Sequence, residues 1–452
     1  MSFATRTWRS LPLGLRLLAI LTPVAVILAG GIAAVVWFGG PPFLDFLGAN
    51  LPLVRFVVAA TGVILLTVPT AFILIYLEMK VIARMNLRVG PSRVGPIGSA
   101  LSVMHGLKVL TKEDFTPSGA DPLVFTLAPV VTFMASIMTL LVVPFAPGLF
   151  GQDLNIGLLY FFAMSGLTVV GLLMGGWSSF NKYSLLGGLR SAAQMVSYEI
   201  PLTLSVVGVI ILTGTMSTNR IVLAQSGSFL DWFVFRQPLA ALIFFIAATA
   251  EANRTPFDMT EADSEIVAGF ATEYSGMRFG FFFFAEYVNL FIVSAIITTI
   301  FFGGWTAPFN WPLAFTLDWL PIGSLPLMWL LAIPGALLFV GELIAIPVKI
   351  IGGRDWGFFD AVIMGCMIAG ALGTALLGFL AFVAFDWVQG IFWFMAKTYF
   401  FIFVFIWMRA TLPRVRVDQL MGFAWKWLLP AALLNLFVTA AAVIVTSPGG
   451  LK

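Results

Sequence analysis

Charged residues are scarce in this sequence: they make up 10% of its 452 residues, whereas about 25% is usual in a soluble domain. Hydrophobic residues make up 60%, which indicates a polytopic membrane protein. The net charge is only +3, and the basic residues fall in short clusters between apolar runs. This distribution fits membrane orientation and argues against nucleic-acid binding.

Residues that bind metals and cofactors are also nearly missing. The single cysteine, Cys366, excludes an intrachain disulfide and a cysteine-ligated iron–sulfur cluster. The single histidine, His105, excludes bis-histidine haem and clustered-histidine metal sites. The sequence has no phosphate-binding Gly-Lys-Ser/Thr motif. We therefore expect no metal, redox centre or nucleotide site in this chain, so that a partner or a substrate must supply any redox chemistry.

Long apolar runs predict the fold class. A membrane-spanning helix needs about 20 apolar residues, and in lipid only a helix pairs all of its own backbone groups. Eleven runs fit this description: 17–39, 53–79, 122–145, 157–176, 190–213, 237–252, 281–302, 325–348, 359–385, 391–408 and 428–446. We therefore predict an all-α polytopic membrane protein with about eleven transmembrane helices.

The basic residues predict the orientation of these helices. If the N-terminus is cytoplasmic, Arg55, Arg220, Arg236 and Lys452 fall outside and Lys397 falls within a span, which leaves 19 of the 24 basic residues inside. The loop between 252 and 281 is then cytoplasmic. The first apolar run also resembles a signal peptide, but its length favours a retained helix.

Acidic residues are concentrated in that cytoplasmic loop and at its edges. Seven of the chain's 21 acidic residues lie there: Glu251, Asp258, Glu261, Asp263, Glu265, Glu273 and Glu286. The spacing of Asp258, Glu261 and Glu265 predicts a short helix that presents several carboxylates together. A solvated acidic surface is the alternative interpretation.

Several ionisable residues lie near or within the predicted spans. Each costs roughly 2.5–3.5 kcal/mol at the bilayer centre, so each requires a reason. One interpretation is a set of interhelical hydrogen bonds that fix packing. The other is a proton pathway, which needs carboxylates in series, and the grouping around one loop system favours it. The residues are Glu78, Arg190, Glu199, Glu251, Glu286 and Lys397.

Five stretches resemble a known family, the membrane-embedded H subunits of bacterial NADH:quinone oxidoreductase (respiratory complex I), which are the counterparts of mitochondrial NADH dehydrogenase subunit 1. They cover about two thirds of the chain. They are Glu78 to Gly95 with LRVGPSRVG, Lys112-Glu113-Asp114 through FTLAPVVTF, GWSSFNKYSLLGGLRSAAQMVSYE at 176–199, NRTPFDMTEADSE with EYSGMRFGFFFFAEY, and FWFMAKTYFFIFVFIWMRATLPRVRVDQLMGFAWKWLLP at 392–430.

The resemblance implies a domain organisation. Residues 51–305 and 391–452 correspond to a family core of about eight helices. Residues 1–50 form an extra N-terminal transmembrane helix, and residues 306–390 form an inserted transmembrane hairpin. Two inserted spans leave the final helices in the family's orientation.

The resemblance also implies a function. The chain walls a chamber that admits quinone, the substrate, and couples quinone reduction to proton translocation. FMN and iron–sulfur clusters belong to partner subunits, and no cofactor is bound here. The expected partners are the peripheral quinone-module subunits, the antiporter-like membrane subunits and lipids of the bacterial cytoplasmic membrane, without nucleic acid.

Two groups of site residues follow from the resemblance. The expected proton relay comprises Glu78, Glu199, Glu251, Asp258, Glu261, Asp263, Glu265, Glu273, Glu286 and Arg190. The residues expected to line the quinone chamber or dock subunits are Arg93, Lys112, Lys182, Tyr183, Arg254 and Arg278. No metal site is expected.

Two alternatives remain open at this point. The chain is also similar to the homologous membrane subunit of an energy-converting hydrogenase or ferredoxin-linked dehydrogenase. The EADSE and EYSG stretches favour the quinone enzyme, and the subunits that copurify would distinguish the two. An independent secondary transporter is disfavoured, because the halves show no inverted repeat.

Overall fold

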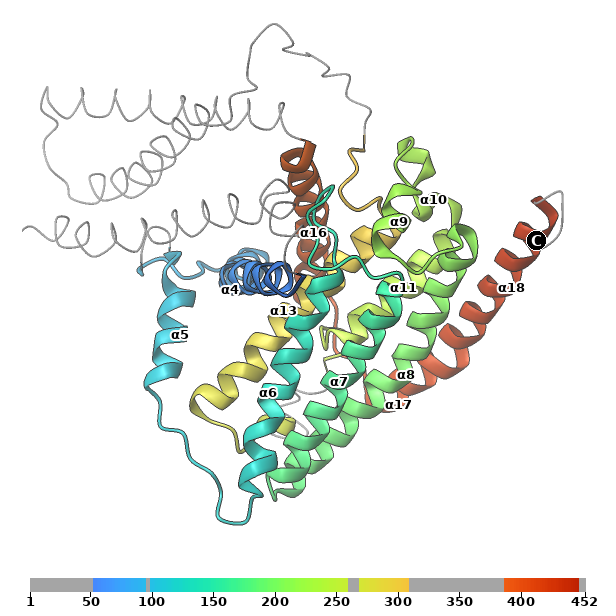
Figure 1. The fold of residues 1–452 in the computed structure, drawn as a ribbon. Coiled ribbons are helices and arrows are strands. Elements are labelled where there is room, and N and C mark those ends of the chain that lie inside the picture. Colours follow the sequence, from blue (N-terminus) through green and yellow to red (C-terminus); the bar gives the residue numbers. More distant parts are fainter. Residues whose placement is uncertain (1–51, 95–97, 259–267, 309–385, 447–452) are drawn as a thin grey trace, which may run out of the picture. The chain divides into compact units, whose positions relative to one another are not determined.

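The computed structural model describes residues 52–94, 98–258, 268–308 and 386–446 (Figure 1). Every regular element within these ranges is helical, which confirms the predicted all-α class. Contacts divide the chain into two compact units, residues 1–55 with 311–389 and residues 56–310 with 390–452. The described residues lie almost wholly in the second unit. The predicted runs 17–39, 325–348 and 359–385 lie outside them, as do residues 1–50 and nearly all of 306–390.

Six helical segments of the described residues are long and apolar enough to cross a membrane. They contain α6 (Pro122–Thr139) with the turn η2 (Leu140–Val142), α7 (Gly157–Ser178), α8 (Lys182–Thr213), α13 (Gly276–Phe301), α16 (Asp386–Thr411), and α17 (Val417–Phe423) with η5 (Ala424–Leu428) and α18 (Leu429–Thr446). These match six of the predicted runs. The run 53–79 lies within α4 (Pro52–Met85), and the run 237–252 is a shorter apolar helix, α11 (Pro238–Glu251).

Shorter helices join these segments. They are α5 (Leu101–Thr111), α9 (Thr218–Leu223), η3 (Phe229–Asp231), α10 (Phe233–Arg236) and η4 (Gly269–Ala271).

Two of the helix starts that differ from the prediction bear on the site. Helix α8 begins at Lys182 rather than 190, because the Asn181 side chain accepts the Tyr183 N–H at 2.9 Å and caps the helix. Helix α13 begins at Gly276 rather than 281, so Glu286 lies within that helix rather than at its start. Hydropathy detects only the apolar part of a helix and misses polar turns that extend beyond it.

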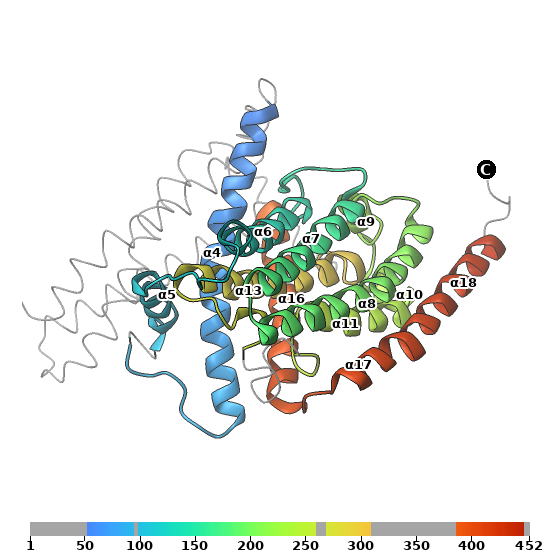
Figure 2. The same ribbon diagram turned by 90° about the horizontal axis from the view of Figure 1, so that it is seen from below.

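Small residues let the central helices approach closely. Helices α6, α7 and α8 lie side by side, and α8 also packs against α11 and α18 (Figures 1 and 2). A Cβ added at Gly171 of α7 would lie 2.2 Å from Thr132 Oγ1 of α6. One added at Gly176 would lie 3.1 Å from the Gly188 Cα of α8. Glycines at such contacts bring helix backbones together in membranes.

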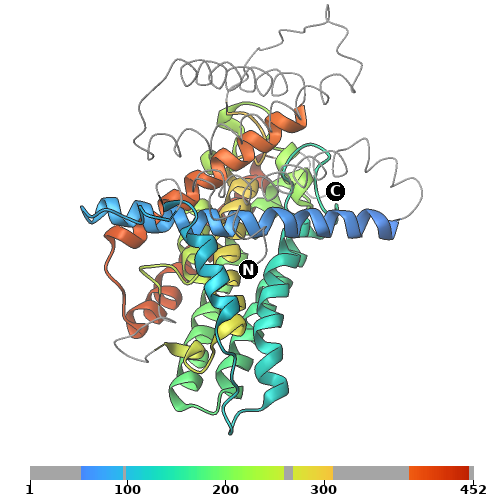
Figure 3. The same cartoon turned by 90° about the vertical axis from the view of Figure 1, so that its left-hand side faces the viewer.

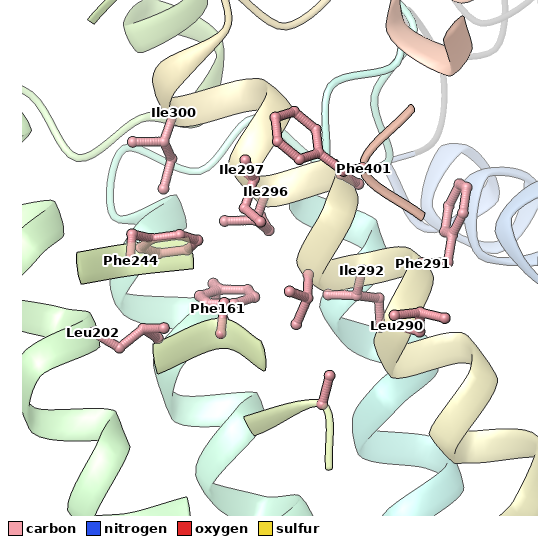
Figure 4. Packing of buried hydrophobic residues seen from close by; sticks show 14 of the residues in the cluster. Phe161, Leu202, Phe244, Leu290, Phe291, Ile292, Ile296, Ile297, Ile300 and Phe401 are labelled. Atoms are coloured by element: carbon pink, nitrogen blue, oxygen red, sulfur yellow. The ribbon is translucent and has the colours of Figure 1, made fainter. Parts of the chain in front are cut away.

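Helix α13 provides the centre of the packing. Its buried residues from Leu290 to Ile300 pack with Phe161 of α7, Phe244 of α11 and Phe401 of α16 (Figure 4). Helix α4 runs across the other helices and contributes Leu74 to the same cluster (Figure 3). Burial of the aromatic and aliphatic side chains around α13 holds together helices that are far apart in the sequence.

Lys397, the cation predicted within a span, closes the C-terminal end of α13. Its Nζ donates to the carbonyl oxygens of Phe302, Gly304 and Thr306 at 2.7, 3.0 and 2.7 Å. It also lies 4.2 Å from the centroid of the Trp232 ring. A cation at this helix end satisfies carbonyls that have no intrahelical donor. Its hydrogen-bond partners among the described residues are main-chain carbonyls rather than the carboxylates.

The loops form two sets that are bonded among themselves. In one set, Ser275 Oγ donates to the Glu113 carbonyl at 3.0 Å, and Asn181 donates to Glu273 at 2.6 Å. In the other, Thr218 Oγ1 donates to the Val142 carbonyl at 2.8 Å, and the Leu158 N–H donates to the Met216 carbonyl at 3.0 Å. The loops joined in the first set are all predicted to be inside, and those joined in the second set are all predicted to be outside.

Candidate functional site

Four charged side chains from four segments meet near one end of the helices. Arg254, in the loop after α11, donates Nη1 to both oxygens of Glu78 on α4 at 3.3 Å. Its Nη2 lies 3.4 Å from Glu286 Oε1 on α13. Arg409 on α16 makes a further ion pair with Glu78. We call Glu78, Arg254, Glu286 and Arg409 the Glu78 cluster.

The centre of the Glu78 cluster is buried, and the cluster is balanced in charge. The side chains of Arg254 and Glu78 are only 3% and 7% exposed. The Arg254 guanidinium also lies 4.7 Å from the centroid of the Tyr287 ring, and the Tyr287 hydroxyl hydrogen-bonds Glu78. Two carboxylates and two guanidinium groups sum to zero charge when all are ionised. A new charge nearby would therefore act on a set of ion pairs that low polarity leaves weakly screened.

The segment that carries Arg254 is held by α8. Gln194 Nε2 donates to the carbonyl oxygens of Ala250 and Phe257 at 2.7 and 2.8 Å. Gln194 is buried, so these bonds are shielded from water and fix the turn after α11. This turn positions Arg254 between α4 and α13.

Two more acids face each other deeper in the helices. Glu251, the last residue of α11, and Glu199 of α8 line one narrow pocket with Ser165, Thr168, Val169 and Met195. The Ser165 hydroxyl hydrogen-bonds Glu251, whereas Glu251 Oε2 is buried without a partner among the described residues. The two carboxyl groups interact electrostatically, so ionisation of one opposes ionisation of the other.

A larger cavity adjoins this pocket. It has a volume of ≈ 260 Å³ and lies between α6, α7, α8, α13 and η4. Glu286, Asn289 and Asn253 provide polar groups, and Phe270, Phe279, Phe282 and Phe283 provide aromatic walls. Glu286 thus belongs both to the Glu78 cluster and to the cavity, and Thr168 and Met195 line both the cavity and the Glu199–Glu251 pocket.

The remaining described loop residues form a separate network at the inner end. Arg278 pairs with Asp114 at 3.1 Å and lies 5.3 Å from the centroid of the Phe125 ring. Tyr274 stacks on Phe125 with centroids 4.1 Å apart and donates to the Phe125 carbonyl at 3.1 Å. Burial raises the pKa of the Tyr274 hydroxyl, which keeps it protonated as a donor. Glu273, expected in the relay, accepts a hydrogen bond from Asn181 at 2.6 Å and so joins two loops; its place in the relay stays a prediction.

The structure places the other predicted site residues in different surroundings. Asp258 lies 3.6 Å from Arg414, and Arg190 is half-buried on α8. Arg93, Lys112, Lys182 and Tyr183 are exposed, and Lys182 lies 5.2 Å from the centroid of the Tyr183 ring. Glu261, Asp263 and Glu265 lie outside the described residues, so their roles stay predictions.

Sequence reasoning missed Arg409, Tyr287 and Gln194. Arg409 follows an apolar run and resembles an ordinary inner-side cation, yet it contacts an acid 331 positions away. Tyr287 directly follows Glu286, and Gln194 lies between Arg190 and Glu199, so both stand in stretches that the resemblance covers. For Tyr287 and Gln194, the signal in the sequence was an uncharged polar side chain close to an acid that was predicted to lie in the membrane.

Comparisons with known proteins identify the family of this chain. Residues 56–440, which include every site residue described above, match the family model described as NADH dehydrogenase. The NADH-quinone oxidoreductase H subunit of Brevibacillus brevis is 42% identical over 390 residues, covering 86% of this chain and 93% of that protein. The protein of the same name from Geobacillus kaustophilus is 43% identical, covering 84% and 92%, and the one from Dehalococcoides mccartyi is 41% identical, covering 83% of each.

Proposed function

The chain belongs to the NADH dehydrogenase family, and from this premise we propose that it is the membrane subunit of a proton-translocating NADH:quinone oxidoreductase that walls the quinone chamber and couples quinone reduction to proton movement. The relatives that bear the name of an NADH-quinone oxidoreductase support this function over the hydrogenase alternative. The electron carriers, FMN and iron–sulfur clusters, would belong to partner subunits docked on the inner loops. The membrane would be the bacterial cytoplasmic membrane, with the N-terminus inside.

One observation carries the proposal: four carboxylates on four helices, Glu78, Glu286, Glu251 and Glu199, line adjoining sites. Glu78 and Glu286 are bridged by Arg254, Glu286 lines the ≈ 260 Å³ cavity, and the cavity shares two lining residues with the pocket of Glu199 and Glu251. Acidic residues that only stabilise helix packing would not need to lie next to one another. Carboxylates in sequence, each within the field of the next, are the arrangement that proton transfer requires.

The charge balance of the Glu78 cluster provides the coupling step. Reduction of quinone takes up protons and adds negative charge transiently near the chamber. Added negative charge weakens the pairing of Glu286 with Arg254 and favours the protonated form of nearby carboxylates. The change in Glu286 is then passed through the cavity toward Glu251 and Glu199.

The test is proton translocation by the assembled complex in proteoliposomes. We expect Glu251→Gln to lower the rate of NADH-driven proton uptake severalfold or more while the subunits still assemble, because glutamine keeps the shape and cannot carry the proton. Asp231→Asn, at an exposed acid near the outer end, is the matched control and should leave the rate unchanged. An unaltered rate and proton-to-electron ratio in Glu251→Gln would reduce Glu251 to a packing residue.

A further inference from the structure

A single long apolar side chain stands between two compartments of the carboxylate series. The cavity that carries Glu286 and the pocket of Glu199 and Glu251 have only Thr168 and Met195 as common lining residues. The cavity has a volume of ≈ 260 Å³, whereas the pocket is too narrow to admit a water molecule. A water molecule takes up about 30 Å³ in the liquid, so the cavity can hold several. The compartment on one side of this wall therefore has room for water, and the one on the other side does not.

One residue of the narrow pocket has an unsatisfied group. Glu251 Oε2 is buried and has no hydrogen-bond partner among the described residues. Buried carboxyl oxygens are normally bonded to protein or to ordered water. An unpaired oxygen on a residue that lines the narrow pocket indicates a position that accepts a water or a proton in another conformation.

Of the two wall residues, Met195 is the one able to move. The Thr168 hydroxyl donates to the Ser165 carbonyl at 2.6 Å, and its side chain is too short to leave the wall without its backbone. Met195 is buried among Val169, Leu172 and Phe282, and an unbranched thioether side chain changes rotamer readily. It has no group that carries a proton.

The position of Met195 on α8 places it directly over the deeper acids. It precedes Glu199 by four residues, so the two side chains share one face of the helix and Glu199 leans back toward Met195. Pro201, in the next turn, has no N–H to bond the Ser197 carbonyl, which leaves α8 without one backbone hydrogen bond beside these residues.

We infer that Met195 is a positioning residue that closes the path between the Glu286 cavity and the Glu199–Glu251 pair until its side chain rotates away. This inference rests on the proposed function and adds the residue that controls when protons pass. With Met195 in place, water is kept from the pocket and a proton at Glu286 has no bridge inward. When the side chain turns into the cavity, water enters, Glu286 releases a proton, and the Glu251 or Glu199 carboxylate accepts it. The closed position prevents protons from leaking through the idle complex.

The experiment measures proton conductance of the intact complex without turnover. The complex is reconstituted in liposomes with an internal pH dye, without NADH or quinone, and an external pH step is applied with potassium and valinomycin to remove the membrane potential. Met195→Gln keeps the length of the side chain and adds groups that bind water, and Met195→Ala shortens it. We expect both to raise the idle conductance severalfold above the parent. Met195→Leu should stay at the parent level.

Matched variants separate this role from packing. Met174→Gln introduces the same change in the same hydrophobic cluster at a residue that lines neither compartment, and should not raise the conductance. Adding Glu251→Gln to Met195→Gln should return the conductance to the parent level. Parent-level conductance in both Met195→Gln and Met195→Ala overturns the inference. This measurement needs no electron donor, so it is independent of the pumping test. If the Met195 variants conduct protons while Glu251→Gln pumps normally, the role of Met195 in closing the path is supported and the proposed function is overturned.

Discussion

At the scale of single residues, Arg254 determines the geometry of the Glu78 cluster. Its planar guanidinium reaches carboxylates on two helices and still lies against the Tyr287 ring. A lysine has one compact ammonium group and cannot bridge both acids while it packs on the ring. Arginine is therefore required at position 254 by the number of groups that its side chain contacts, and not by its positive charge alone.

Removal of Arg254 should destabilise the assembled protein. Arg254→Met leaves Glu286 without its ion pair to Arg254 and Glu78 with Arg409 alone, and breaking a buried ion pair costs about 3–5 kcal/mol. Arg254→Lys should cost less. The thermal unfolding midpoint of the purified complex measures both effects. The double variant Arg254→Met/Glu286→Gln should recover part of the loss, and purely additive midpoints would contradict direct coupling between the two residues.

At the scale of helices, hydropathy predicted which segments are helical but not where they end. The ends depend on single polar contacts, such as the Asn181 side chain that starts α8 eight residues before the apolar run. Helix α5 was not predicted, because it has only 11 residues and a search for spans of about 20 passes over it. His105 and Lys108 also interrupt its apolar residues, so no long apolar run marks it.

The C-terminal end of α13 shows how a helix end is held by distant residues. Lys397 supplies three donors to carbonyls at 302–306, and the Gln225 side chain donates to the carbonyls of Thr299 and Ile300 at 3.2 and 3.1 Å. Both side chains are far from α13 in sequence. They fix the turn through which the chain leaves the described core.

We expect Lys397→Met to loosen this end of α13. Methionine keeps the apolar stem but removes the ammonium group, so three carbonyls lose a charged donor, and hydrogen bonds to charged groups are worth about 1.5–3 kcal/mol each. Amide hydrogen exchange across 298–306 should accelerate at least tenfold. Lys426→Met, at an exposed lysine, is the control and should leave this exchange unchanged. Equal protection in Lys397→Met and the parent would show that the carbonyls find other donors.

At the scale of the whole molecule, the sequence identified the acids of the site but not their pairing. Glu78, Glu199, Glu251 and Glu286 stood out because ionisable groups are rare in apolar segments. Their partners did not, since Glu78 contacts Arg254 and Arg409 across 176 and 331 positions, and no local pattern encodes such separations. The bond between Glu273 and Asn181, 92 positions apart, is likewise not encoded in any local pattern. Composition can predict where charge is costly, whereas only the packed helices determine which charges meet.

The arrangement of loops makes the predicted orientation testable. Leu87 directly follows α4, and Lys426 lies in η5 after a loop that is bonded to the Arg254 loop through the Val415 N–H and the Pro256 carbonyl. Leu230 lies in η3, in the segment between α8 and α11 that belongs to the second set of loops. Counting basic residues assigns the first set to the cytoplasm. Single cysteines can report this assignment in a Cys366→Ser background, because Leu87 and Leu230 are 97% and 69% exposed.

We expect an impermeant maleimide to label Leu87→Cys and Lys426→Cys in inside-out vesicles and Leu230→Cys in right-side-out vesicles. The vesicles are first washed at alkaline pH to remove docked subunits that would cover the inner loops. Labelling of Leu87→Cys and Leu230→Cys from the same side would contradict the separation of the two loop sets. Labelling of all three from the reversed sides would keep the fold and invert its orientation, and would move the Glu78 cluster away from the compartment in which NADH is oxidised.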